Sequence, residues 1–274
     1  MPVGMAQFEA PPELLLAQMS YVGVDHCVLQ TGMNYGLMND YNAFAQRQHP
    51  DKFTGLFQVD EPMADMPRWM QEVDRARHQL GLRGLYYQLD TFSRYGFGWA
   101  FDDPRFDAFW ELLASLDMPI FFEATPVPDY DEASYIANMQ RLDGLLTRFP
   151  RMRWLLVMGP PVQYFAQGGR WHFPDPVART YARENLQVEI MFPITWGGVW
   201  DYPYPEAQAL IRDFRDRFGA HKLIWGSDMP NVERFCTYRQ CLDYVRRYCD
   251  FFSSKEKELV LGANLADLCG IRVP

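Results

Sequence analysis

The feature that most constrains the fold is an alternation, along the whole chain, of short apolar runs with longer amphipathic segments. Runs rich in β-branched and aromatic residues predict seven strands, at 25–31, 53–59, 83–89, 119–124, 153–158, 186–192 and 222–228. Apolar residues recur every three to four positions over 66–81, 103–116, 131–149 and 204–219, which predicts helices. This alternation is typical of βα units around a parallel sheet.

Evenly spaced βα units without a Gly-x-Gly-x-x-Gly turn favour an α/β fold of the (β/α)8 TIM-barrel kind over a dinucleotide-binding sheet. A helical segment over 11–23 precedes the first predicted strand, so the barrel's first strand is absent from this chain or irregular. Either a longer natural product carries that strand upstream of Met1, or the N-terminal "PVGMAQF" or a partner subunit covers the edge. No linker or low-complexity tract divides the chain, so we expect a single domain over 1–274.

Charge and hydropathy exclude several classes of partner. The formal net charge is -9 and the chain has no run of Lys or Arg, which argues against nucleic acid and anionic membranes. No apolar stretch reaches the ~18 residues of a membrane span, and the N-terminus lacks the pattern of a signal peptide. Five cysteines without a Cys-x-x-Cys pair indicate reduced thiols. We therefore expect a cytoplasmic protein with a small-molecule substrate.

Two carboxylates stand where predicted strands end. Asp228 follows the apolar run in "LIWGSDMP", and Glu123 closes the run in "PIFFEATP". In a parallel barrel the carboxyl ends of the strands form the catalytic face, so side chains at these positions point toward substrate. Each carboxylate is a candidate general acid or base, a candidate metal ligand, or a cap for the helix that follows.

Several predicted loops combine aromatic rings with positive charge. An arginine near aromatic walls suits a planar, carboxylated ligand, through paired hydrogen bonds to the acid and stacking on the ring. The alternative is that these rings pack loop against loop or against a neighbouring subunit. Of the adjacent strand residues Tyr86 and Tyr87, only one can face the barrel interior. The candidate substrate-binding residues are Tyr87, Arg94, Trp99, Arg170, His172, Trp196 and Trp200.

The stretch "LIWGSDMP", together with "MPIFFEATP", "RWLLVMGPP" and "YVGVDHCVLQ" in the same order and at similar spacing, resembles the amidohydrolase superfamily. The resemblance is closest to the branch that includes aminocarboxymuconate semialdehyde decarboxylase, and it covers the chain from Pro11 onward. It implies a (β/α)8 barrel whose eighth strand ends on the essential aspartate, here Asp228. In that family the aspartate binds the metal and shuttles the proton. Asn264 matches the start of the family's C-terminal helix, where a structural role is expected.

The chain departs from the family pattern at the metal ligands. It contains no His-x-His, and the positions of the two histidines that end strands five and six hold Glu123 and Met158. A thioether is a poor ligand for zinc or manganese. We therefore predict no metal site and no cofactor from this chain. Zinc or manganese is expected only if a His-x-His segment lies upstream, with Asp228 and, in a second version, Glu123 among the ligands.

These observations predict an amidohydrolase-type enzyme, a hydrolase or carboxy-lyase. It would hydrolyse or non-oxidatively decarboxylate a small cyclic or aromatic carboxylic acid, with Asp228 in proton transfer. Without a metal, Asp228 and Glu123 must divide the acid and base roles. The alternative is a non-catalytic barrel that has lost its metal site and serves as a binding or subunit-interaction protein. A homodimer is compatible with the family and with the 16% aromatic content.

Overall fold

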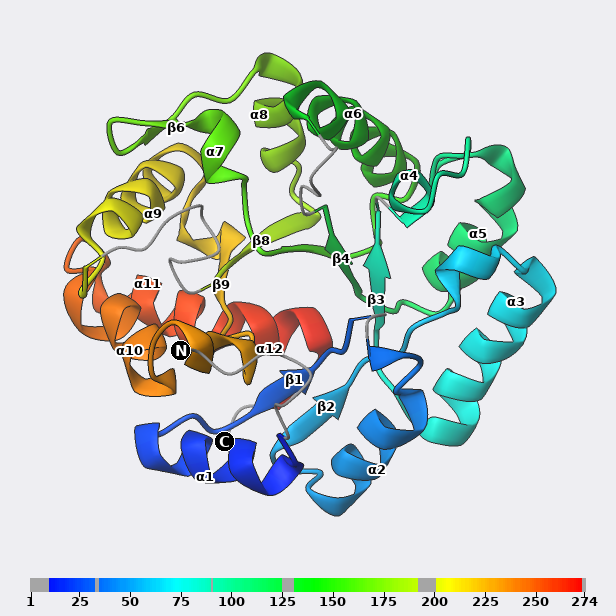
Figure 1. Ribbon diagram of the computed structural model, residues 1–274, viewed down its shortest axis with the longest axis horizontal. Helices are drawn as coiled ribbons and strands as arrows, with labels where there is room; N and C mark the ends of the chain where they lie inside the picture. Colours follow the sequence, from blue (N-terminus) through cyan, green and yellow to red (C-terminus); the bar gives the residue numbers. More distant parts are fainter. Residues whose placement is uncertain (1–9, 33–34, 90, 125–130, 192–200, 273–274) are drawn as a thin grey trace. The chain divides into compact units, whose positions relative to one another are not determined.

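A computed structural model of the protein describes residues 10–32, 35–89, 91–124, 131–191 and 201–272 (Figure 1). The chain divides into two compact units. One, here the β1–β5 unit, comprises 26–157 and 174–186. The other, here the β8–β9 unit, comprises 1–25, 158–173 and 187–274.

Parallel strands form the centre of the β1–β5 unit. Strand β1 pairs with β2, and β4 pairs with both β3 and β5. A parallel bridge between Phe57 and Leu85 continues the pairing from the end of β2 to β3. The strands are β1 (Cys27–Leu29), β2 (Phe53–Gly55), β3 (Leu85–Gln88), β4 (Ile120–Glu123) and β5 (Trp154–Val157).

The helices of this unit begin where the sequence supplies caps. Asp65 accepts a hydrogen bond from the backbone N–H of Arg68 at the start of α3, and Asp131 accepts one from Ser134 at the start of α6. The helices are α2 (Asn39–Gln48), α3 (Met66–Arg75, continued by a π turn, Ala76–Leu80), α4 (Thr91–Arg94), α5 (Asp107–Ser115), α6 (Glu132–Arg148) and α8 (Asp175–Tyr181), with 3-10 turns at Glu61–Met63 and Pro104–Phe106.

The two faces of the β3–β4–β5 sheet carry different side chains. On the face toward the helices, the rings of Tyr87 and Trp154 lie 5.2 and 5.6 Å from the ring of Trp110 in α5. Side chains alternate along a strand, so Tyr86, Gln88 and Glu123 lie on the opposite face, here the inner face. Burial of the aromatic layer and its edge-to-face ring pairs, worth about 0.5–1.5 kcal/mol each, hold the helices on the sheet.

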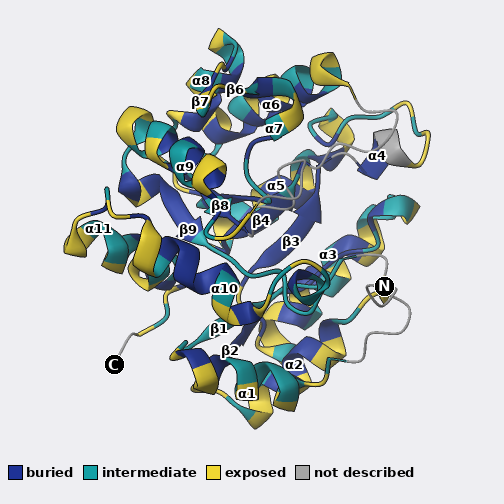
Figure 2. Ribbon diagram, turned by 60° about the vertical axis from the view of Figure 1, so that its left-hand side comes forward, coloured by how far each residue is buried: buried dark blue, intermediate teal, exposed yellow. Residues whose placement is uncertain are grey.

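The β8–β9 unit is built on the parallel pair β8 (Leu186–Ile190) and β9 (Leu223–Trp225), with Val188 opposite Leu223. A short hairpin, β6 (Ala166–Gln167) and β7 (Arg170–Trp171), contacts α9 through its second strand. The helices are α1 (Pro12–Val22), α7 (Val162–Phe165), α9 (Pro205–Phe218), α10 (Tyr238–Asp243), α11 (Ser254–Glu258) and α12 (Asn264–Cys269), with 3-10 turns at Ala220–Lys222 and Asn231–Arg234. A π segment, Tyr244–Tyr248, continues α10, and another, Leu259–Ala263, joins α11 to α12. Figure 2 shows buried strands and helices that combine buried with exposed faces, as amphipathic periodicity predicts.

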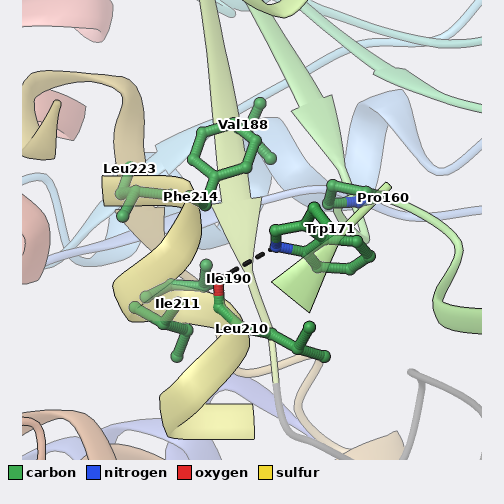
Figure 3. A pocket seen from close by; sticks show the side chains of 8 residues that line it. All are labelled: Pro160, Trp171, Val188, Ile190, Leu210, Ile211, Phe214 and Leu223. Carbon is green, nitrogen blue, oxygen red and sulfur yellow. Dashed lines mark hydrogen bonds between the residues drawn. The ribbon is translucent and has the colours of Figure 1, made fainter. Parts of the chain in front are cut away.

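A small apolar cavity lies between β8, β9, α9 and the hairpin (Figure 3). The only nitrogen that its lining side chains carry belongs to Trp171, whose Nε1 donates a hydrogen bond of 2.9 Å to the carbonyl of Leu210. A cavity with this lining offers a ligand no polar contact, so it is a packing space rather than a substrate site. It is lined by Pro160, Trp171, Val188, Ile190, Leu210, Ile211, Phe214 and Leu223.

The structure confirms the predicted order of elements. Each of the seven predicted strand segments contains a strand, and the predicted helices at 11–23, 66–81, 103–116, 131–149 and 204–219 are present. Helix α12 begins at Asn264, where the family resemblance implied a helix start, whereas helices α2, α4, α7, α8, α10 and α11 and the β6–β7 hairpin were not predicted. The segment "PVGMAQF" lies outside the described residues, so its predicted role at the barrel edge stays a prediction. Within the described part of the chain, no helix has both the length and the apolar character that crossing a membrane requires.

Candidate active site

The Gly-Ser-Asp turn after β9 holds Asp228 in a left-handed backbone conformation, with φ 51°. Aspartate is among the few residues that tolerate this region, and strain of this kind gathers at functional sites. The half-buried carboxylate accepts a hydrogen bond of 2.6 Å from Asn231 Nδ2, and Asn231 Oδ1 accepts one of 2.9 Å from Arg234. Asn231 therefore fixes the orientation of the Asp228 carboxylate.

A second carboxylate, Glu189, belongs to the same unit. It alternates with the buried residues Val188 and Ile190 and therefore lies on the other face of β8. Its Oε2 accepts a hydrogen bond of 3.1 Å from the backbone N–H of Met158. Its Oε1 lies only 1.8 Å from the position that a Cβ on Gly226 would occupy, so the carboxylate sits against the turn that carries Asp228.

Glu189 was missed at the sequence level. The signal was present, because "LQVEI" alternates apolar and polar residues with a carboxylate at the penultimate position of the strand. A residue ending a strand is easily recognised as a site candidate, whereas one inside a strand is easily passed over. Met158, which stands at a position of a family histidine, contributes a backbone N–H and also has a positive φ of 69°.

Glu123 ends β4 in the β1–β5 unit, as the sequence predicted. Its Oε2 accepts hydrogen bonds from the hydroxyl of Tyr86 and, at 2.9 Å, from Gln88 Nε2. Both donors are buried and come from β3, directly beside β4. The carboxylate of Glu123 therefore belongs to a polar cluster on the inner face rather than to a helix cap.

The structure places Tyr86, not Tyr87, beside the Glu123 carboxylate. The Tyr87 side chain is completely buried on the helix-facing side, against Trp69 and Trp110. Burial raises the pKa of its phenol well above the ordinary value, and among the described residues its hydroxyl has no hydrogen-bond partner. The sequence predicted that only one of these two adjacent tyrosines faces the inside of the barrel. In β3 the side chain of Tyr86 lies on the inner face and that of Tyr87 on the helix-facing side.

We expect Tyr87→Phe to leave turnover unchanged and to raise the free energy of unfolding by up to about 1 kcal/mol. The substitution removes a buried hydroxyl that has no partner while keeping the ring packing. Tyr86→Phe is the matched comparison, because it removes the donor to Glu123. Denaturant unfolding and initial-rate assays of both variants provide the measurement. Loss of activity on Tyr87→Phe would restore the substrate-binding role that the sequence suggested.

The remaining predicted binding residues differ in their surroundings. Trp99 packs within its own loop, with its ring stacked on Phe97 at 5.2 Å and the guanidinium of Arg105 4.3 Å above it. Arg170 and His172 are exposed on and beside β7, which contacts α9. Trp196 and Trp200 lie outside the described residues, and the side chain of Arg94 is likewise not described. For Trp99 the structure shows loop packing, and its contact with a ligand stays a prediction.

The buried thiols of the β8–β9 unit are poor nucleophile candidates. Burial raises the pKa of Cys236 and Cys241, and it raises the pKa of Cys249 to about 12. A thiol reacts as the thiolate, so these groups stay protonated near neutral pH. Asp228 and Glu123 therefore stay the predicted acid–base groups.

The described residues do not fit a bound zinc or manganese ion. Within 10–32, 35–89, 91–124, 131–191 and 201–272, no group of three or more His, Cys, Asp or Glu side chains is placed to hold a metal. A catalytic zinc site uses about three protein ligands. We therefore derive no reaction step through a metal, and the conditional metal prediction stays a prediction.

Comparison with solved structures gives the fold. The chain is similar to a probable 2-pyrone-4,6-dicarboxylic acid hydrolase from Acinetobacter baumannii, with 19% identity, 98% of this chain and 94% of that chain covered, and a TM-score of 0.73. It is similar to a manganese-bound dihydroxybenzoic acid decarboxylase from Polaromonas sp. JS666, with 15% identity and a TM-score of 0.68; the match covers 94% of this chain and 86% of that chain. It is also similar to a zinc-bound amidohydrolase from Burkholderia multivorans, with 15% identity and a TM-score of 0.75; the match covers 98% of this chain and 91% of that chain. No curated protein matches the chain.

The fold is thus the α/β TIM barrel of amidohydrolases, as the sequence predicted. The model of the amidohydrolase family matches residues 3–270, and the chain belongs to that family. The protein is therefore an enzyme of the amidohydrolase family. The non-catalytic alternative has no support from the family or from the structural relatives.

Proposed function

We propose that the protein hydrolyses or non-oxidatively decarboxylates a small cyclic or aromatic carboxylic acid, with Asp228 as the proton-transfer residue. The observation that carries this proposal is the backbone conformation of Asp228 together with the hydrogen bond to its carboxylate. It follows β9, it is held at φ 51°, and a short hydrogen bond from Asn231 fixes its half-buried carboxylate. A strained and oriented carboxylate at a strand end is the arrangement expected of a general acid or base.

Both reactions need one group that takes up and returns a proton. In hydrolysis, Asp228 removes a proton from water as the water oxygen bonds to the carbonyl carbon, and then protonates the leaving group as its bond breaks. In decarboxylation, the carbon–carbon bond to the carboxylate breaks, carbon dioxide leaves, and protonated Asp228 delivers its proton to the carbon left behind. The identity of the scissile bond therefore depends on the substrate, whereas the role of Asp228 is common to both.

Glu189 supports the role of Asp228 by holding the adjacent backbone. Its carboxylate accepts a hydrogen bond from the N–H of Met158 and lies against Gly226, two residues before Asp228. Glu123, with Tyr86 and Gln88 as donors, stays a predicted second acid–base group, and its role is tested separately by Glu123→Gln.

The experiment is a turnover assay with a panel of aromatic and cyclic carboxylic acids, carried out beside elemental analysis of the purified protein. Release of carbon dioxide identifies decarboxylation, and a ring-opened or cleaved acid identifies hydrolysis. We expect at least one acid to be turned over by the wild type and not by Asp228→Asn. Zinc or manganese at one equivalent would contradict the expectation that this chain holds no metal. Full activity of Asp228→Asn would show that the proposed function is wrong.

A further inference from the structure

Three arginines of the β8–β9 unit share one carboxylate. The nearest nitrogens of Arg239, Arg246 and Arg247 lie 3.3, 2.5 and 3.2 Å from the oxygens of Asp243. The side chain of Asp243 is only 6% exposed, whereas those of Arg239 and Arg247 are 47% and 57% exposed. With three positive charges and one negative charge, this group of residues, here the Asp243 cluster, carries a surplus of positive charge at neutral pH.

A shortage of acidic residues does not explain this surplus. The chain contains 35 Asp and Glu residues against 26 Lys and Arg residues. Among the described residues, however, Asp243 is the only carboxylate within ion-pair distance of the three arginines. Like charges held this close repel one another, and an anion bound at their exposed side would offset the repulsion.

The two outer arginines have donor groups that the fold leaves unused. Arg247 contacts Asp243 through Nε, and its two terminal nitrogens make no hydrogen bond to any described residue. Arg239 contacts the same oxygen of Asp243 and donates a terminal N–H to the hydroxyl of Tyr21 at 3.2 Å. Since the Tyr21 hydroxyl accepts this bond, its own proton is left for a further acceptor. Tyr21 is 69% exposed, so a ligand in solution reaches it.

The contacts around the Asp243 cluster hold it in place. Arg246 is committed to the fold, because it also donates to the carbonyl of Val22 at the end of α1, at 2.8 Å. The Nε1 of Trp225 in β9 donates to the carbonyl of Cys241 in α10 at 3.0 Å. These bonds fix α10 against α1 and β9. The outer arginines therefore extend from a rigid support, which a binding site requires.

We propose that Arg239 and Arg247, with the hydroxyl of Tyr21, form a binding site for a phosphate group, as inorganic phosphate or as a small phosphate monoester. A phosphate group carries a charge of about -1.5 to -2 at pH 7 and offers only acceptor oxygens, and the unused groups here all donate. Guanidinium groups bind phosphate through paired hydrogen bonds. A single carboxylate carries less charge and would leave the Asp243 cluster positive. The inference goes beyond the proposed function, since none of these residues takes part in the proposed reaction.

The experiment is calorimetric titration of the full chain with inorganic phosphate and with glycerol phosphate, at constant ionic strength, with acetate as the monoanion control. We expect a Kd of about 1 mM for at least one phosphate compound, the affinity of a few charge-assisted hydrogen bonds, and binding of acetate that is at least about tenfold weaker. Tighter binding of glycerol phosphate would identify a phosphate monoester as the ligand, and tighter binding of inorganic phosphate would identify the free anion.

The double variant Arg239→Gln/Arg247→Gln tests the site itself. It removes both outer guanidinium groups but leaves Arg246 to pair with Asp243. We expect the Kd for phosphate to rise at least about tenfold, the effect of one lost charge-assisted hydrogen bond or more. Thermal unfolding without phosphate checks the fold. If the double variant does not fold, Arg247→Gln alone serves, because Arg239 then stays with Asp243 and Tyr21.

Arg212→Gln is the matched control. The side chain of Arg212 is 54% exposed in the same unit, and it pairs with its own carboxylate, Asp250, at 3.4 Å. This variant removes the same charge elsewhere, so it should keep the wild-type Kd. The inference is overturned if the wild type binds neither phosphate compound, if acetate binds as tightly, or if Arg212→Gln weakens binding as much as Arg247→Gln. Asp228→Asn should bind phosphate like the wild type, so failure of the proposed function and failure of this site are separate outcomes.

Discussion

Asp228→Asn is expected to lower kcat by about 10²- to 10⁴-fold, the range by which general acid–base groups accelerate reactions. Asparagine has nearly the same shape, tolerates the left-handed conformation at φ 51°, and can accept the hydrogen bond from Asn231 through its amide oxygen. The substitution therefore removes the ability to carry a proton while the turn stays in place. Steady-state kinetics on the acid found by the panel assay give kcat, and thermal unfolding checks the fold.

Asp250→Asn is the control for this variant. Asp250 makes an exposed ion pair with Arg212, and its side chain is 85% exposed. Exposed pairs of this kind contribute little, so the control should keep wild-type kcat and stability. If Asp228→Asn loses no more activity than Asp250→Asn, Asp228 is not the proton-transfer residue. An equal loss in Glu123→Gln would instead support a division of acid and base roles between two carboxylates.

The fold could be predicted from the sequence because short apolar runs mark the strands and a three- to four-residue apolar spacing marks the helices. Alternating strands and helices carry their own caps, such as Asp65 and Asp131 at the starts of α3 and α6. Asp228 and Glu123 were also accessible, because a polar residue that ends an apolar run is visible without coordinates. Helices α10 and α11 were missed, although Thr237 and Ser253 each form a capping box at their starts. The π segments that continue them, Tyr244–Tyr248 and Leu259–Ala263, break the 3.6-residue period by which a helix is recognised in a sequence.

The finer parts of the site depend on which face a strand turns inward. Tyr86 and Tyr87 are chemically alike, and only the packing of Tyr87 against Trp69 and Trp110 decides between them. Gln58 belongs to no motif, and only the folded chain shows that its buried side-chain amide has no hydrogen-bond partner among the described residues. Trp99 shows that an aromatic residue in a loop can also pack against its own loop, here against Phe97 and Arg105. Aromatic composition alone therefore does not distinguish a ring-binding loop from one that packs on itself.

The structural role of Asn264 illustrates how distant segments fix β9. Its buried Nδ2 donates to the carbonyls of Ala220 and Leu223, at 3.0 and 2.8 Å. These bonds tie the start of α12 to the start of the strand that leads to Asp228. The sequence predicted a structural role for Asn264, and its two side-chain hydrogen bonds confirm such a role.

Gly226→Ala is the second large effect that we expect. The new Cβ would lie 1.8 Å from Glu189 Oε1 and 2.9 Å from its Cγ, so the whole carboxylate must move aside. The N–H of Met158 then loses the acceptor that it contacts at 3.1 Å. We expect the free energy of unfolding to fall by about 1–3 kcal/mol, from steric crowding and from the unpaired backbone N–H. Activity should fall as well, because the turn that orients Asp228 is displaced.

A double-mutant cycle with Glu189→Ala separates this mechanism from a general intolerance of alanine in the turn. If the clash with Glu189 causes the damage, removing the side chain creates room for the new Cβ, and the double variant is more stable than the sum of the two single changes predicts by about 0.5–3 kcal/mol. Denaturant unfolding of the four proteins measures the coupling. Strict additivity would show that Gly226 is required for its backbone and not for the space that it leaves to Glu189. Gly262→Ala, where a Cβ would meet no atom within 4 Å, is the control for a harmless glycine replacement.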